Sequence, residues 1–122
     1  MDKVTQHDDR KIYWIVDPQG GKGKTWLAGI LVAHYGAIVV QGQARDVFHE
    51  WQGEPIVIFD ISHSLSEKID YSAMDSIKNG IVFSGKYDSK VTFYKQPEVL
   101  VFASCYPRRS AMSEDRWDIT KI

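Results

Sequence analysis

The chain lacks several features that would point to particular classes of protein. It has one cysteine, Cys105, so an intramolecular disulfide and a zinc site built from several cysteines are both excluded. No apolar run approaches the roughly 18 residues that a membrane-spanning helix needs. The first residues, MDKVTQHDDRK, have no apolar core of the kind found in signal peptides. We therefore expect neither membrane insertion nor secretion.

An excess of charge of one sign is also missing. Fifteen basic and 16 acidic residues give a formal net charge of −1, so the overall charge does not favour nucleic-acid binding. Any such binding would need a local basic patch. What the chain does have is an ordinary share of hydrophobic residues, 43% of 122, which is enough for one compact domain with a core.

Apolar runs alternate with segments of helical periodicity along the chain. The apolar residues of the first helical segment recur at intervals of three and four. We predict strands at Lys11–Asp17, Ala37–Val40, Ile56–Phe59 and Val99–Ala103 and in the final RWDITKI, helices at Lys24–Tyr35, Ala44–Trp51 and Tyr71–Lys78, and a β-hairpin of Ile81–Ser84 and Val91–Tyr94. This order predicts an α/β fold with a parallel sheet and helices on both faces. Ligands of such sheets bind at the carboxyl ends of the strands.

A glycine-rich loop, DPQGGKGKT, joins the first strand to the first helix. It fits the phosphate-loop pattern GxxxxGK[ST], except that Asp17 replaces the first glycine. Glycines let backbone N–H groups surround a phosphate chain, and the helix N-terminus adds partial positive charge. The candidate nucleotide contacts are Gly20, Gly21, Lys22, Gly23, Lys24 and Thr25, with Lys24 on the β- and γ-phosphates and Thr25 on Mg²⁺. The alternative, a glycine-rich turn with an incidental lysine, rarely produces this pattern in this context.

An acidic residue ends the third predicted strand. Asp60 follows four apolar residues, and we expect it to bind Mg²⁺ opposite Thr25. The alternative is an aspartate that merely caps a following helix. Many motor ATPases carry a second acid at the next position as the base for the attacking water, but here that residue is Ile61. The base is therefore either Asp60 itself or a residue elsewhere, with Glu67 and Asp70 as unranked candidates.

The ordered segments GGKGKT, IVIFDIS, KNGIVFSGKY, VLVFASCYP and SEDR together resemble the superfamily 3 helicase domain of viral replication-initiator (Rep) proteins. The likeness is to nanoviruses, their alphasatellites and related circular single-stranded-DNA viruses, and it runs from Tyr13 to Ile122. It implies a compact AAA+-like P-loop NTPase fold spanning residues 1–122 as one helicase domain, without the upstream nicking endonuclease domain. It also implies ATP and Mg²⁺ as cofactors, single-stranded DNA and a hexameric ring as partners, and the host nucleus as the compartment.

The resemblance assigns roles to three further positions. The KNGIVFSGKYDSKVTF segment matches a hairpin that grips the DNA backbone, with Lys86 as first choice and Lys90 as second; the alternative is two ordinary solvated lysines. Ser104 stands where the family has a catalytic asparagine, three residues before Pro107. A serine hydroxyl hydrogen-bonds similarly but reaches less far, which puts efficient hydrolysis in question.

Arg116, in the terminal SEDR, matches an arginine that acts as a catalytic finger in the neighbouring subunit's nucleotide site. The planar, permanent charge of arginine suits this role. The alternative is an intramolecular salt bridge to Asp115 or Glu114. Arg108 and Arg109 are rivals for the same role.

Three functions compete for this set of residues. The first is an oligomeric, DNA-stimulated ATPase that translocates on single strands. The second is a small-molecule phosphotransferase, for whose arginine-bearing lid and second substrate pocket the chain has little length. The third is a nucleotide-dependent assembly module with weak hydrolysis, which Ile61 and Ser104 favour. ATP-dependent assembly without phosphate release would distinguish the third from the first.

Overall fold

The computed structural model describes residues 11–18, 23–40, 44–61, 69–84 and 90–122. The described part is an alternation of strands and helices, as the sequence predicts. In chain order the elements are β1 (Ile12–Val16), α1 (Lys24–Tyr35), β2 (Ala37–Val40), α2 (Ala44–Glu50), β3 (Ile56–Ile61), α3 (Tyr71–Lys78), β4 (Ile81–Ser84), β5 (Lys90–Phe93), β6 (Glu98–Ala103) and β7 (Trp117–Lys121). Two short 3-10 turns, Arg109–Ala111 and Glu114–Arg116, precede β7.

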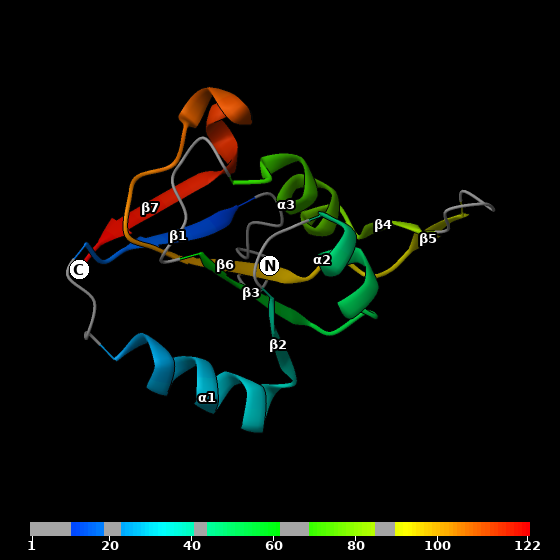
Figure 1. Ribbon diagram of the computed structural model, residues 1–122, viewed down its shortest axis with the longest axis horizontal. Coiled ribbons are helices and arrows are strands. Elements are labelled where there is room, and N and C mark those ends of the chain that lie inside the picture. The colour runs from blue at the N-terminus through cyan, green and yellow to red at the C-terminus, as the bar shows by residue number, and fades with distance from the viewer. Residues whose placement is uncertain (1–10, 19–22, 41–43, 62–68, 85–89) are drawn as a thin grey trace, which may run out of the picture.

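Five strands form one parallel sheet in the order β2-β3-β6-β1-β7 (Figure 1). The predicted α/β fold with a parallel sheet is thereby confirmed. The order places β1, which leads into the glycine-rich loop, between β6 and β7. It also places β6 between β1 and β3, so Ser104, directly after β6, lies between the carboxyl ends of the other two strands.

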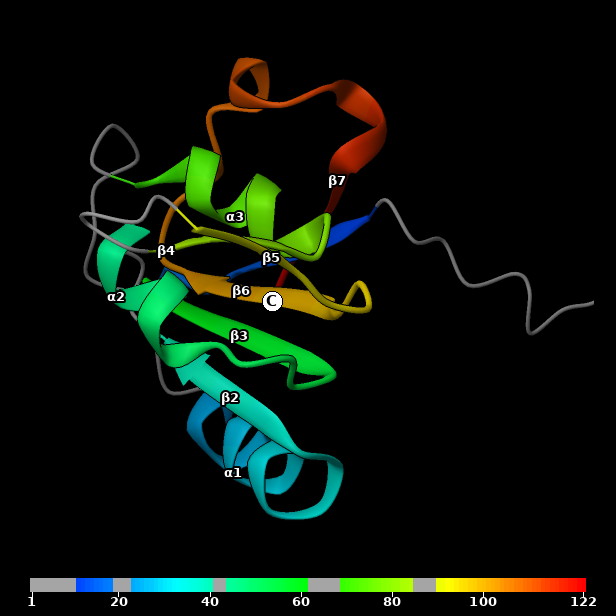
Figure 2. The same ribbon diagram turned by 90° about the vertical axis from the view of Figure 1, so that its right-hand side faces the viewer.

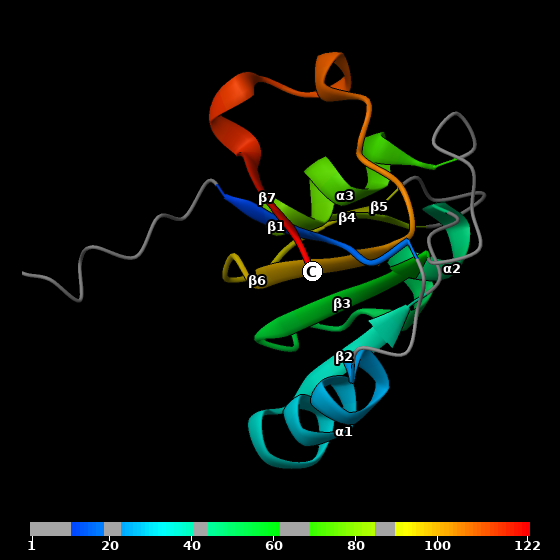
Figure 3. The same ribbon diagram turned by 90° about the vertical axis from the view of Figure 1, so that its left-hand side faces the viewer.

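Helices cover both faces of this sheet, as predicted. α2 and α3 lie on one face and α1 on the other (Figures 2 and 3). The face under α2 and α3 carries the larger core, in which Trp14, Phe59 and Met74 have no exposed surface. Among the described residues, the face under α1 has a small buried cluster of Ala37, Ile58 and Phe102. The two layers therefore differ strongly in how much apolar surface they bury.

Helix α1 packs more loosely than its sequence pattern indicates. None of its residues is fully buried; Leu27, Ala28 and Leu31 contact the small cluster, while His34 lies outside it and is exposed. A side chain of α1, Trp26, is 72% exposed. The helix ends as predicted, because Gly36 takes the left-handed conformation that its backbone N–H needs to cap the Leu31 carbonyl.

The predicted β-hairpin is confirmed as an antiparallel pair, β4 with β5, between α3 and β6. It lies on the side of the sheet that carries α2 and α3 (Figure 2). Phe83 of β4 packs edge-on against Phe48 of α2, with ring centroids 5.9 Å apart. Tyr94, just after β5, packs against Trp51 at 5.0 Å. Aromatic contacts with α2 and with Trp51, the residue that follows it, thus pack the hairpin against this part of the chain.

Candidate nucleotide-binding site

The carboxyl ends of three neighbouring strands lie in one row. In the sheet register Val16 of β1 pairs with Ala103 of β6, and Ala103 pairs with Ile61 of β3. Asp17 and Ser104, which follow directly, therefore start from adjacent points on the same sheet edge. This is the edge at which parallel sheets bind ligands.

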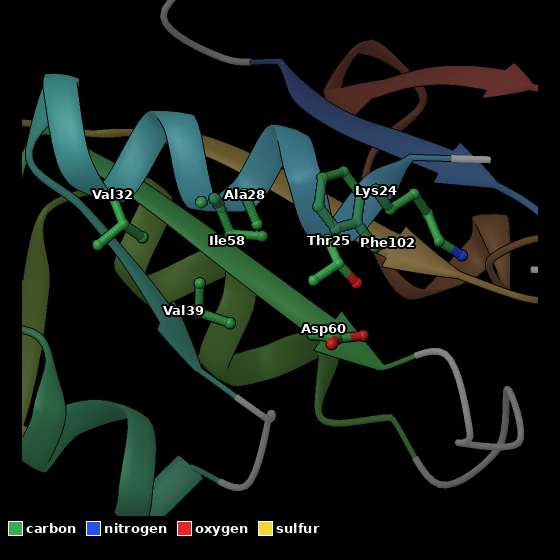
Figure 4. A pocket seen from close by; sticks show the side chains of 9 residues that line it. Lys24, Thr25, Ala28, Val32, Val39, Ile58, Asp60 and Phe102 are labelled. Carbon is green, nitrogen blue, oxygen red and sulfur yellow. The ribbon is translucent and has the colours of Figure 1, made fainter. Parts of the chain in front are cut away.

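A pocket of about 400 Å³ opens beside this edge, between α1 and the sheet. Thr25, in the first turn of α1, and Asp60, on β3, lie across from each other at the end near Lys24, while Val32 and Val39 line the other end (Figure 4). The structure thus brings Asp60 together with Lys24 and Thr25, from which it is far apart in the sequence. Hydroxyl and carboxylate oxygens are the donors that Mg²⁺ prefers.

The Lys24 side chain turns toward the end of β1. Its ammonium nitrogen lies 3.4 Å from an oxygen of the Asp17 carboxylate, and the two side chains are 14% and 0% exposed. Sequence reasoning treated Asp17 only as a departure from the phosphate-loop pattern and did not pair it with Lys24. The sequence did contain a signal for this pair. A carboxylate at the end of a buried strand needs a cationic partner when it is buried, and Lys24 is near it in the sequence.

Asp60 lies within β3, not beyond its end as predicted, because the pairing with β6 continues through Asp60 and Ile61. Successive strand residues point to opposite faces. Asp60 is accordingly exposed on the α1 side, whereas Ile61 is 3% exposed in the core under α2 and α3. The position after Asp60 therefore faces away from the pocket.

Of the two other candidates for a catalytic base, Asp70 has a structural role. Its carboxylate accepts a hydrogen bond from the Ala73 backbone N–H and caps α3. It lines a separate pocket with Tyr71 and Arg108, not the pocket of Lys24 and Thr25. Glu67 lies outside the described residues, as do Gly20, Gly21 and Lys22 of the glycine-rich loop.

The segment after β6 is anchored to the core beneath it. Ser104, which stands at the position of the family's catalytic asparagine, is half-buried. The carbonyl of the next residue, Cys105, accepts a hydrogen bond of 2.8 Å from the Trp14 indole. Trp14 in turn stacks on Tyr71 and meets Trp117 edge-on. The Trp14 indole thus ties the segment that carries Ser104 to β1, and two further aromatic rings pack against that indole.

The three candidate finger arginines occupy different environments. Arg116 is 4% exposed: its guanidinium donates a 2.7 Å hydrogen bond to Asn79 and lies 3.2 Å from the Asp75 carboxylate. The salt bridge considered from the sequence therefore exists, but its partner is on α3 and not Asp115 or Glu114.

The two rival arginines are on the surface. Arg109 donates to Glu114 at 2.6 Å, and this hydrogen bond lowers the pKa of the Glu114 carboxyl. Arg108 is exposed, with its guanidinium carbon 5.2 Å from the centre of the Tyr71 ring. The Arg108 guanidinium thus lies over the Tyr71 ring and is exposed to solvent.

The predicted DNA contacts are described only in part. Lys90 begins β5 and is exposed, in register with Ser84 of β4. Lys86 lies outside the described residues. Lys90 is therefore exposed at the first residue of β5, where it can contact another molecule.

The chain is similar to master replication proteins of viruses and to a Para-Rep of an alphasatellite. It is 42% identical over 121 residues to the master replication protein of Subterranean clover stunt virus and 39% over 114 residues to that of Faba bean necrotic yellows virus. It is 35% identical over 117 residues to Para-Rep C3 of Milk vetch dwarf C3 alphasatellite. These alignments cover 95%, 93% and 92% of the chain. This chain is a nanovirus- and alphasatellite-like Rep homologue.

The relation to these Rep proteins has clear bounds. The chain spans 42%, 40% and 41% of the length of these three relatives. No family model and no solved structure matches it. Among the described residues, no helix combines the length and apolarity needed to cross a bilayer. The comparisons therefore relate the chain to part of these replication proteins, and the chemistry of the site is inferred from the geometry of the pocket.

Proposed function

We propose that this Rep homologue is an ATP-hydrolysing helicase motor of superfamily 3, with a compact AAA+-like phosphate-loop fold. The observation that carries the proposal is the meeting of Lys24, Thr25 and Asp60 at one pocket on the carboxyl edge of a parallel sheet. A cation and a hydroxyl at a helix N-terminus, with a carboxylate across from them, are groups that phosphoryl transfer from a nucleotide uses. The relatives, named as replication proteins, support a motor that acts on DNA.

The residues present suit a magnesium nucleotide. Thr25 and Asp60 are exposed oxygen donors on opposite walls of the pocket, and they would hold Mg²⁺ between them (Figure 4). No group of three or more metal-ligating side chains occurs among the described residues. That donor set fits Mg²⁺, which usually takes one or two protein ligands and completes its shell with phosphate oxygens and water. When bound, the ion would neutralise charge on the phosphates.

The protein's own groups would act by position and charge. Lys24 would contact the β- and γ-phosphates, and Ser104, between β1 and β3, would hydrogen-bond the γ-phosphate or the attacking water. An arginine from a neighbouring subunit of a ring would complete the site. Lys86 and Lys90 on the hairpin would move along the backbone of single-stranded DNA as each ATP is hydrolysed.

A second function has an observation in its favour. Ile61 is buried on the far side of β3 and Asp70 caps α3, so neither position offers a base to the pocket of Lys24 and Thr25. A nucleotide-dependent assembly module that binds ATP and hydrolyses it slowly would need no such base. This alternative predicts a change of oligomeric state with ATP and little phosphate release.

Phosphate release from ATP, measured with and without Mg²⁺ and single-stranded DNA over a range of protein concentrations, distinguishes the two functions. The motor predicts turnover that needs Mg²⁺ and rises with both DNA and protein concentration. Lys24→Met should abolish it, and Asp118→Asn, which removes an exposed carboxylate elsewhere near α1, should not. Nucleotide binding and ATP-dependent assembly without turnover would favour the second function, and absence of nucleotide binding would overturn both.

A further inference from the structure

The strongest unexplained feature of the site is the buried pair between Asp17 and Lys24. Asp17 occupies the position where the phosphate-loop pattern begins with glycine, and its side chain has no exposed surface. One of its carboxylate oxygens lies 3.4 Å from the Lys24 ammonium. The residue that departs from the pattern therefore contacts the very lysine that the pattern provides for phosphate binding.

The backbone around Asp17 holds its carboxylate in this place. The Asp17 N–H donates a 2.8 Å hydrogen bond to the Ala103 carbonyl at the end of β6. On the other side, the Ile122 N–H donates to the Val16 carbonyl at 2.9 Å. Asp17 is thus fixed between β6 and the end of β7, and its carboxylate is a stationary acceptor, whereas Lys24 reaches it on a flexible four-carbon side chain.

A bound polyphosphate would compete with this carboxylate for one ammonium group. Lys24 must weaken its contact with Asp17 to reach the phosphates, and Asp17 would then remain as a buried negative charge close to the negative nucleotide. Leaving a buried charge with less compensation is costly. Both effects weaken the binding of nucleotide and neither depends on Mg²⁺.

We propose that Asp17 is a positioning residue. In the nucleotide-free protein it holds Lys24 away from the place that the phosphates would occupy, and it thereby lowers the affinity for nucleoside di- and triphosphates. The inference rests on the proposed nucleotide site and adds to it an internal competitor. Lys24 exchanges one anionic partner for another when nucleotide binds. Affinity is thus set by a residue that would not touch the nucleotide.

The test is the affinity of the chain for a fluorescent ATP analogue, with and without Mg²⁺, for wild type, Asp17→Asn and Asp17→Gly. Glycine serves as the second variant because the phosphate-loop pattern has it at this point. We expect both variants to bind about tenfold more tightly, within the usual range of coupling between two linked contacts. The gain should appear with and without Mg²⁺ and should lower KM for ATP with kcat nearly unchanged.

The matched control is Asp118→Asn, because Asp118 is exposed and lines a pocket with Lys24. A similar gain from this control would assign the effect to net charge and overturn the role of the ion pair. Unchanged or weaker binding by both folded Asp17 variants would also overturn it. Lys24 should in addition react faster with an amine-acetylating reagent in Asp17→Asn than in wild type, and an equal rate would contradict the pairing. If wild type itself bound no nucleotide, the proposed function would fail first.

Discussion

At the scale of single residues, the ion pair of Asp17 with Lys24 decides how the usual phosphate-loop mutation should be read. Replacing the lysine removes a nucleotide contact, but here it also leaves a fully buried carboxylate without its lysine partner. Loss of activity in such a variant has two possible causes. Stability must therefore be measured together with activity.

We predict that Lys24→Met lowers the free energy of unfolding by roughly 3 kcal/mol, because breaking a buried pair from one side leaves its other charge poorly compensated. Adding Asp17→Asn should restore most of that loss, since the double variant buries no carboxylate there. Denaturant unfolding of both single variants and the double variant measures the coupling. Additive effects would show that the pair contributes nothing to stability.

Residues of this kind mark the limit of what a sequence shows. The pattern located Lys24, Thr25 and Asp60, and the pocket brings these three together. The sequence pattern does not reveal the partner of Asp17 or the contacts of Arg116 with Asp75 and Asn79. Those contacts join segments that become neighbours only when the sheet folds. They leave no periodic pattern in the sequence from which they could be predicted.

At the scale of elements, periodicity predicts the bounds of α1 and α3 closely, because a capping residue marks one end of each of these helices. Gly36 ends α1 and the Asp70 carboxylate caps α3, as such residues generally do. The extension of β3 to Ile61 was missed, since it depends on pairing with β6. The looseness of α1 was missed as well, because its pattern of apolar residues says nothing of how much sheet surface lies beneath.

The junction between α3 and β4 gives a test of the fold at this scale. Gly80 has φ +79°, and a Cβ there would lie 2.3 Å from the Tyr94 carbonyl oxygen. Gly80→Ala should therefore lower the free energy of unfolding by roughly 2–4 kcal/mol through backbone strain and overlap. Gly29→Ala is the control, because its Cβ meets no atom within 4 Å, and it should raise stability by roughly 0.5–1 kcal/mol. Thermal unfolding compares the two, and equal effects would contradict the packing at Gly80.

The hairpin offers a prediction about DNA. If Lys86 and Lys90 contact phosphates, their joint replacement by alanine should weaken binding to single-stranded DNA at every sequence tested. Each lost phosphate contact should also reduce the slope of log affinity against log salt by about 0.7. Lys95→Ala removes an exposed charge just after β5 and is the matched control. Fluorescence anisotropy at several salt concentrations measures the slopes, and an unchanged slope in the double variant would rule out the hairpin as the phosphate-binding element.

At the scale of the whole molecule, the two faces of the sheet are unequal. One face has a core of aromatic and aliphatic residues under α2 and α3, while the α1 face has three buried residues among those described. Val32 of α1 and Val39 of β2 line the candidate nucleotide pocket and are 44% and 40% exposed. The proposed nucleotide site thus lies in the layer that is less tightly packed, where a bound ligand would add contacts that the protein lacks. We therefore expect nucleotide to stabilise the chain against unfolding.

The proposed arrangement into a ring predicts that an arginine from the next subunit completes each site. The candidate arginines differ in their contacts within the chain. Arg116 is held by Asp75 and Asn79 within its own chain, so Arg116→Ala should destabilise the fold whatever else it does. Arg108 is exposed, and Arg108→Ala should leave the fold intact while removing most ATP turnover. The decisive measurement is a mixture of Arg108→Ala with Lys24→Met, each inactive by itself. A mixed ring contains interfaces in which an intact lysine site meets an intact arginine, so phosphate release should reappear. If the mixture stays inactive although both proteins assemble, Arg108 does not act across the interface.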